Sequence, residues 1–183
     1  MLVITERDEK IKQFLEEVGV ADTKTLSTLF FPNTTIRNCQ KRLKQLTDNN
    51  YIKVYRENML SQNVYFVKKP KNIPHKIKFS QLLAELKIQN IEVLKYKCPF
   101  AIGPVIADGL IVVKKEDVKI YFVEAERTKT LNIKKYLELY YSRSYKEKFP
   151  VMPSILVITD KTVPKSDELH IVKCNWNLEN LNI

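Results

Sequence analysis

Residues 105–127, VIADGLIVVKKEDVKIYFVEAER, constrain the fold of this chain more than any other stretch. Two short segments rich in Val, Ile and Tyr, 109–113 and 120–123, flank the charged segment 114–117, which predicts two strands joined by a hairpin turn. Asp108 precedes the first strand, and Glu124 and Glu126 follow the second. Since residues two apart in a strand share a face, Glu124 and Glu126 point the same way, and strand pairing can bring Asp108 beside them.

Carboxylates gathered at strand ends repel one another and are costly to bury. A site that holds a hard divalent cation is one arrangement that offsets this cost, which makes Asp108, Glu124 and Glu126 together a candidate metal site. The alternative interpretation is that the acids lie at strand ends in solvent.

The composition excludes several classes of protein. The 183 residues suit one ordinary domain or two small ones, 44% of them are apolar, and neither a membrane span nor a signal peptide is expected. Three scattered cysteines without a CxxC pair suit a reducing cytoplasm, three glycines exclude a P-loop or dinucleotide fingerprint, and two distant histidines exclude an HExxH zinc site. The net charge of +10 favours a polyanionic partner.

The N-terminal part, 1–69, has the element order of a winged helix-turn-helix domain. Apolar periodicity predicts helices at 6–18, 23–31 and 34–49, with Gly19 ending the first and Asp22 capping the second. Strands follow at 51–55 and 64–67, on either side of a polar loop at 56–63. In such domains the third helix enters the major groove of DNA.

The third helix and the strand after it carry the candidate DNA-binding residues. Six basic residues stand against one acid between residues 34 and 56, whereas the first helix is acidic. The candidates are Thr34, Thr35, Arg37, Asn38, Gln40, Lys41, Arg42, Lys44, Lys53 and Arg56. The alternatives are a solvated helix face or a winged helix that contacts protein. The pattern Leu43, Leu46, Tyr51-Ile52 resembles that of many winged-helix regulators.

Residues 70–74, PKNIP, predict a short stiff linker, and residues 75–183 a second domain. Helices are expected at 75–89 and 131–149, and further strands at 91–96, 154–159 and 170–174, with a loop at 98–104. We therefore expect an α+β or α/β chain, in which the winged helix precedes a mixed sheet flanked by helices.

The order helix, strand, hairpin, helix, strand, with Asp108 and Glu124 at the ends of the middle strands, resembles the PD-(D/E)xK nuclease core of restriction endonucleases. The resemblance implies that Asp108 and Glu124 hold Mg²⁺ if the domain is active, with Glu85 as an auxiliary acid. Glu126 stands where that family usually has Lys; some members place an acid there, so Glu126 is a further catalytic candidate, and Lys129, Lys134 or Lys135 could supply a displaced amine. Ile106-Ala107 also replaces the proline that usually precedes the Asp.

A winged helix before this core, His75 ahead of the helix, "AD" at 107–108 and YFVEAERTK at 121–129 resemble the replication-relaxation family of plasmids, phages and integrative elements. That family is associated with DNA replication and relaxation. We therefore expect a cytoplasmic protein that binds double-stranded DNA, with other replication or transfer proteins as further partners. A homodimer is expected from the two-fold symmetry of typical DNA half-sites.

Three functions remain open from the sequence. The first is sequence-directed DNA binding in replication, transfer or transcriptional control of a mobile element, with a degenerate nuclease-like second domain. The second is a magnesium-dependent nuclease or nicking, relaxase-like enzyme that uses Asp108 and Glu124. The third is a protein-interaction module, which the basic third helix disfavours. We favour the first over the second because Glu126 replaces the expected Lys.

Overall fold

The computed structural model describes residues 2–56 and 61–183, and part of the predicted loop at 56–63 lies outside them. It has an α+β fold that divides into two compact units, Met1–Gln89 and Asn90–Ile183. Its helices are α1 (Glu6–Val18), α2 (Thr23–Phe30), α3 (Ile36–Asp48), α4 (Ile73–Ile88), α5 (Ile133–Ser142) and the 3₁₀ helix η1 (Ser144–Glu147). Its strands are β1 (Ala21–Asp22), β2 (Lys53–Tyr55), β3 (Val64–Phe66), β4 (Glu92–Lys97), β5 (Phe100–Ile102), β6 (Val105–Ala107), β7 (Gly109–Lys114), β8 (Val118–Ala125), β9 (Ser154–Ile158) and β10 (Ile171–Cys174).

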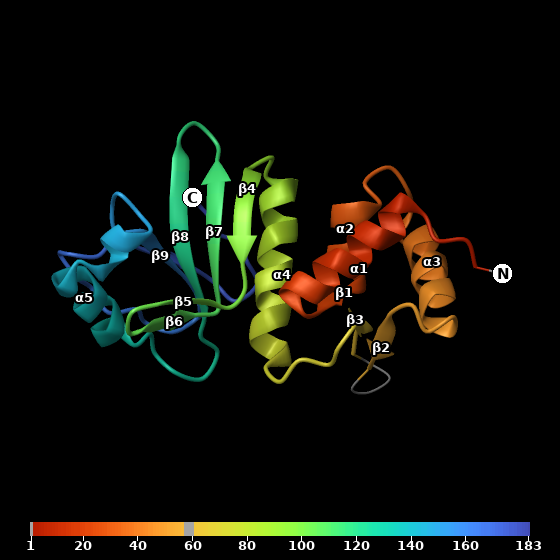
Figure 1. Cartoon of the computed structure of the whole chain (residues 1–183), viewed down its shortest axis with the longest axis horizontal. Helices are drawn as coiled ribbons and strands as arrows, with labels where there is room; N and C mark the ends of the chain where they lie inside the picture. Colours follow the sequence, from red (N-terminus) through yellow and green to blue (C-terminus); the bar gives the residue numbers. More distant parts are fainter. Residues whose placement is uncertain (1, 57–60) are drawn as a thin grey trace. The chain divides into compact units, whose positions relative to one another are not determined.

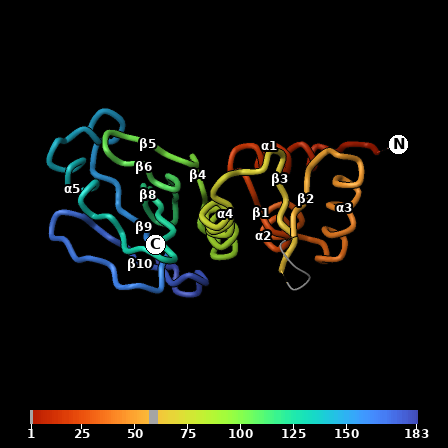
Figure 2. Tube along the Cα trace, turned by 90° about the horizontal axis from the view of Figure 1, so that it is seen from below, coloured from red at the N-terminus to blue at the C-terminus, as the bar shows by residue number. Residues whose placement is uncertain are grey.

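In the first unit, helices α1, α2 and α3 precede a small antiparallel sheet in the order β1-β3-β2 (Figure 2). The predicted helix boundaries are confirmed to within two residues because local signals set them. Gly19 ends α1 at φ 97°, where a side chain would be strained, and its N–H donates to the Leu15 carbonyl. Asp22 caps α2, as predicted, and accepts from Thr25 N at 2.7 Å.

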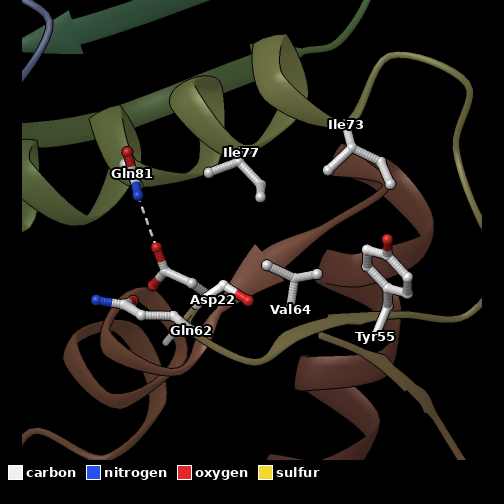
Figure 3. A pocket seen from close by; sticks show the side chains of 8 residues that line it. Asp22, Tyr55, Gln62, Val64, Ile73, Ile77 and Gln81 are labelled. Atoms are coloured by element: carbon white, nitrogen blue, oxygen red, sulfur yellow. Dashed lines mark hydrogen bonds between the residues drawn. The ribbon is translucent and has the colours of Figure 1, made fainter. Parts of the chain in front are cut away.

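Helix α4 belongs to the first unit, so the observed division differs from the predicted boundary at 70–74. The last residues of the predicted linker begin the helix, since Asn72 is its N-cap and Pro74 lies in its first turn. Two contacts hold the helix there: Gln81 Nε2 donates to Asp22 Oδ2 at 2.6 Å (Figure 3), and Lys87 Nζ donates to the Leu29 carbonyl at 2.7 Å. The amphipathic pattern predicted helix α4, but it did not predict that the apolar side of α4 would pack in the first unit.

In the second unit, a five-stranded mixed sheet runs in the order β10-β9-β8-β7-β4, and Figure 1 shows β9, β8, β7 and β4 side by side. The predicted hairpin is confirmed as β7 and β8, which pair antiparallel with Gly109 opposite Val123. Strands β8 and β9 are parallel, and α5 lies between them along the chain. One buried cluster joins this helix to the sheet through Phe122, Tyr136 and Leu139, with Phe100, Val105 and Phe149 among its other members.

Two local predictions in the second unit were wrong. Residues 98–104 are not all loop, because β5 and β6 form an antiparallel hairpin there; its buried residues, Phe100, Ile102, Val105 and Ala107, belong to the apolar cluster. The helix expected at 131–149 ends at Ser142, where Arg143 takes a left-handed conformation at φ 57°. The Ser142 hydroxyl accepts from Ser144 N at 3.4 Å, a local hydrogen bond that competes with continued helix.

No membrane span was expected from the sequence. Within residues 2–56 and 61–183, no helix combines the length and the apolar character that crossing a bilayer requires.

Candidate functional site

The structure brings Asp108 to the end of β8, as the predicted hairpin requires. Asp108 immediately precedes β7, and its Oδ2 accepts a hydrogen bond from Ala125 N at 2.8 Å. Ala125 is the last residue of β8, and Glu124 is the residue before it. Asp108 is half-buried. It therefore fixes the point at which β8 leaves the sheet and lies close enough to raise the pKa of Glu124 by charge repulsion.

Glu124 is the most deeply buried acid of the second unit, with only 4% of its surface exposed. A single carboxylate oxygen, Oε1, accepts from the Tyr136 hydroxyl at 2.5 Å and lies 2.6 Å from Lys135 Nζ. Burial raises the pKa of Glu124, although the hydrogen bonds from Lys135 and Tyr136 lower it in part. Both donors come from the first turn of α5, so packing of that helix on the sheet builds the site.

Lys135 is a basic residue that reaches Glu124. Its side chain is 21% exposed, and besides Glu124 its Nζ donates to the Ile106 carbonyl of β6 at 2.9 Å. The sequence offered Lys129, Lys134 or Lys135 as a displaced amine, and the first two are exposed. Lys135 thus joins β6, β8 and α5 at the carboxylate end of the hairpin.

Tyr136 lies where the three predicted acids converge. Its ring is fully buried, and burial raises the pKa of its phenol, with the charges of Glu124, Asp108 and Glu126 raising it further. The phenol therefore stays protonated and donates to Glu124. Glu126 lies just beyond β8 and is half-buried, and its backbone N–H donates to the Ile158 carbonyl at 3.0 Å.

The fourth predicted acid, Glu85, lies on α4 in the first unit, where its Oε1 accepts from Gln89 Nε2 at 3.0 Å. Glu85 therefore belongs to a different compact unit from Asp108, Glu124 and Glu126. Sequence order alone had placed it in the same domain.

The residues present do not fit a metal site built by the protein alone. Within the part of the chain that the structure describes, no group of three or more His, Cys, Asp or Glu side chains is placed to hold a metal ion. Glu124, one of the two candidate ligands, already binds an ammonium group through Oε1. Hard divalent cations are held by several oxygen ligands, whereas this site offers a carboxylate that is paired with a cationic side chain.

The second group of candidate residues lies on α3. Thr35 caps this helix, and its Oγ1 accepts from Asn38 N at 3.4 Å. Nine of the ten candidates are exposed: Thr34, Thr35, Arg37, Asn38, Gln40, Lys41, Lys44, Lys53 and Arg56. Lys44 pairs with Asp48 at 2.8 Å, and Arg56 donates to the Ser61 carbonyl at 2.8 Å. Arg37 and Lys41, one helical turn apart, are therefore the best-placed cations of this face.

Arg42, the tenth candidate, has a structural role instead. Its guanidinium forms an ion pair with Asp8 of α1, with Nε 3.0 Å from Oδ1 and Nη2 bonded to Oδ2, and it also donates to the Val3 carbonyl at 2.7 Å. Asp8 is fully buried, which would raise its pKa, but the hydrogen bonds from Arg42 and Thr5 prevail and lower it to about 2. The sequence predicted Arg42 as a DNA contact because it lies among the basic residues of the third helix. Its partner Asp8 is 34 residues away, so the ion pair could not be predicted from local sequence.

An apolar side chain at the start of α3, Ile36, is exposed. The residue is 51% exposed, whereas Cys39, Leu43 and Leu46 are buried. Ile36 is the first residue of the helix, so the apolar stripe continues past the end of the core. An apolar side chain is thereby presented beside Thr35 and Arg37.

A hollow of about 280 Å³ in the first unit lies between β1, β3 and α4. It is lined by Asp22, Tyr55, Ser61, Gln62, Val64, Ile73, Ile77 and Gln81 (Figure 3). Both carboxylate oxygens of Asp22 accept hydrogen bonds, Oδ1 from Thr25 N at the start of α2 and Oδ2 from Gln81. The role of Asp22 in this hollow is therefore structural.

No family model, no curated protein and no solved structure matches this chain. The exposed face of α3 and the Glu124 site are therefore the two features of this protein that bear on its function.

Proposed function

We propose that this protein is a double-stranded DNA-binding protein whose first unit is a winged helix-turn-helix domain that reads DNA through α3. The observation that carries the proposal is the exposed face of α3, on which Arg37 and Lys41 stand beside short polar side chains. Cations supply phosphate contacts, and Asn, Gln and Thr side chains can hydrogen-bond to base edges in the major groove. A net charge of +10 adds long-range attraction to a polyanion.

The topology of the first unit supports this interpretation. Three helices followed by two strands, with β1 between α1 and α2 completing the sheet order β1-β3-β2, is the arrangement expected of a winged helix. In that arrangement β2 and β3 form the wing. Lys53 and Arg56, at β2 and just after it, are exposed and would contact phosphates beside the groove.

A mixed sheet with Asp108 and Glu124 at the ends of β7 and β8 supports a nuclease-like architecture for the second unit. We propose that it is degenerate in cleavage and serves DNA binding or assembly. The setting, replication, transfer or transcriptional control of a plasmid, phage or integrative element, rests on the resemblance to the replication-relaxation family. A homodimer would match the two-fold symmetry of DNA half-sites.

The decisive test is DNA selection from a random double-stranded library, followed by anisotropy titration of the selected site at several salt concentrations. Affinity should fall steeply as salt rises, because phosphate contacts release counterions. Arg37→Ala and Lys41→Ala should each weaken binding, whereas Lys10→Ala, the matched loss of an exposed lysine on α1, should not. A DNA affinity that does not change with salt concentration, or that is the same for all three variants as for the wild-type chain, would refute the proposal.

The alternative, a DNA nuclease or nicking enzyme, is favoured by one observation. Lys135 places an amine 2.6 Å from Glu124, although Glu126 fills the usual lysine position. The lack of a three-ligand group among the described residues weighs against it. Incubation with supercoiled DNA and Mg²⁺ or Mn²⁺ decides between them: nicking that Glu124→Gln abolishes would establish the enzyme, and intact DNA would leave the binding function.

A further inference from the structure

The Glu124 site already contains a cation. The carboxylate is almost fully buried, and the ammonium group of Lys135 meets its Oε1 at 2.6 Å. A buried carboxylate needs a cation or strong donors to remain charged, and here the protein provides both through Lys135 and Tyr136. Glu124, one of the acids predicted as metal ligands, therefore meets an internal counter-ion.

We propose that Lys135 is the resident counter-cation of the Asp108–Glu124 site and that it excludes divalent cations from it. The proposal concerns the second unit alone and stands whether or not α3 binds DNA. It explains why acids arranged like those of a metal nuclease are accompanied by no third metal-ligating side chain in the described residues.

The geometry shows what a divalent cation would have to overcome. To contact Glu124 Oε1 it would have to displace Lys135, which would lose its ion pair and its 2.9 Å hydrogen bond to the Ile106 carbonyl. The cation would also shed water in a nearly closed site with few oxygen ligands to replace it. With Lys135 in place, the negative charge of Glu124, which would attract the cation, is already neutralised.

Removing the ammonium should convert the site into one that binds divalent cations. In Lys135→Met, the side chain keeps much of its length but loses its charge, so Asp108 and Glu124 act together on an added cation. A unit charge within about 4 Å of the bound ion is worth more than the ~1.4 kcal/mol that equals a tenfold change in affinity. We therefore expect Lys135→Met to bind Mn²⁺ at least about tenfold more tightly than the wild-type chain.

The test uses the full chain and Mn²⁺ alone, followed by calorimetric titration and by the shift in thermal unfolding. Lys134→Met, an exposed neighbour with the same change of charge, is the matched control and should behave as wild type. Glu124→Gln combined with Lys135→Met should lose the gained affinity. If Lys135→Met binds Mn²⁺ no more tightly than Lys134→Met, the proposal is overturned.

A second comparison keeps the proposal falsifiable if Lys135→Met does not fold. If Lys135 keeps Mn²⁺ away from Glu124, the carboxylate makes no contribution to Mn²⁺ binding. Glu124→Gln in the otherwise wild-type chain should therefore leave the Mn²⁺ affinity unchanged. A loss of Mn²⁺ affinity in Glu124→Gln would show that the wild-type site holds the metal despite Lys135, and would overturn the proposal.

Discussion

Replacing Arg42 with Ala separates a structural cation from the DNA-binding cations of α3. The guanidinium is the partner of Asp8, which is fully buried at the start of α1. Breaking a buried ion pair by removing one member costs ~3–5 kcal/mol, since the other charge stays buried. Thr5 still donates to Asp8 through its backbone N at 2.8 Å and through its hydroxyl, so we expect a loss of about 3 kcal/mol at pH 7.

The pH dependence of this loss follows from the pKa of Asp8. The folded-state pKa lies at about 2, below its usual value of 3.8. A carboxyl with a depressed folded pKa contributes stability that is fully present above the unfolded pKa and is lost as pH falls through the folded pKa. That contribution is about 2 kcal/mol in the wild-type chain, and it depends on Arg42. The difference between wild type and Arg42→Ala should therefore shrink between pH 7 and pH 3.

Urea unfolding at both pH values measures this difference. Circular dichroism at 222 nm follows mainly the first unit, which contains α1 to α4, while fluorescence of Trp176, the single tryptophan, follows the second. Lys41→Ala, which removes an exposed cation of the same helix, should change the free energy of unfolding by less than about 0.5 kcal/mol. An Arg42→Ala loss equal to that of Lys41→Ala, or as large at pH 3 as at pH 7, would refute the reasoning.

The remaining predictions concern the DNA face and the Glu124 site. Arg37→Ala with Lys41→Ala should reduce the slope of log affinity against log salt by about two, and an unchanged slope would move the interface elsewhere. If Ile36 contacts a thymine methyl, replacing that thymine with deoxyuridine should weaken wild-type binding about fourfold and leave Ile36→Ala unaffected; equal sensitivity of both proteins would exclude the contact. Lys135→Met should destabilise the second unit more at pH 8 than at pH 5, because burial raises the pKa of Glu124 and its unpaired charge is costly only once the proton is lost. Trp176 fluorescence during urea unfolding would measure this, and a loss independent of pH would contradict it.

Much of the fold followed from local patterns. Periodicity and caps located α1 and α2, and two short apolar segments on either side of a charged turn located β7 and β8. Such signals act over a few residues, so they can be read directly from the chain. The pairing of β7 with β8 then followed, and it placed Asp108 at the end of β8, beside Ala125.

The sequence by itself thus determined helices α1 to α4, the β7–β8 hairpin and the concentration of basic residues on α3. The tertiary structure alone decided which charged groups meet: Arg42 with Asp8, Lys135 with Glu124, and α4 with the first unit. The physical reason is that these contacts join residues from 11 to 59 positions apart, where many partners of the right charge compete. Only packing, which buries some of these groups and exposes others, selects among them.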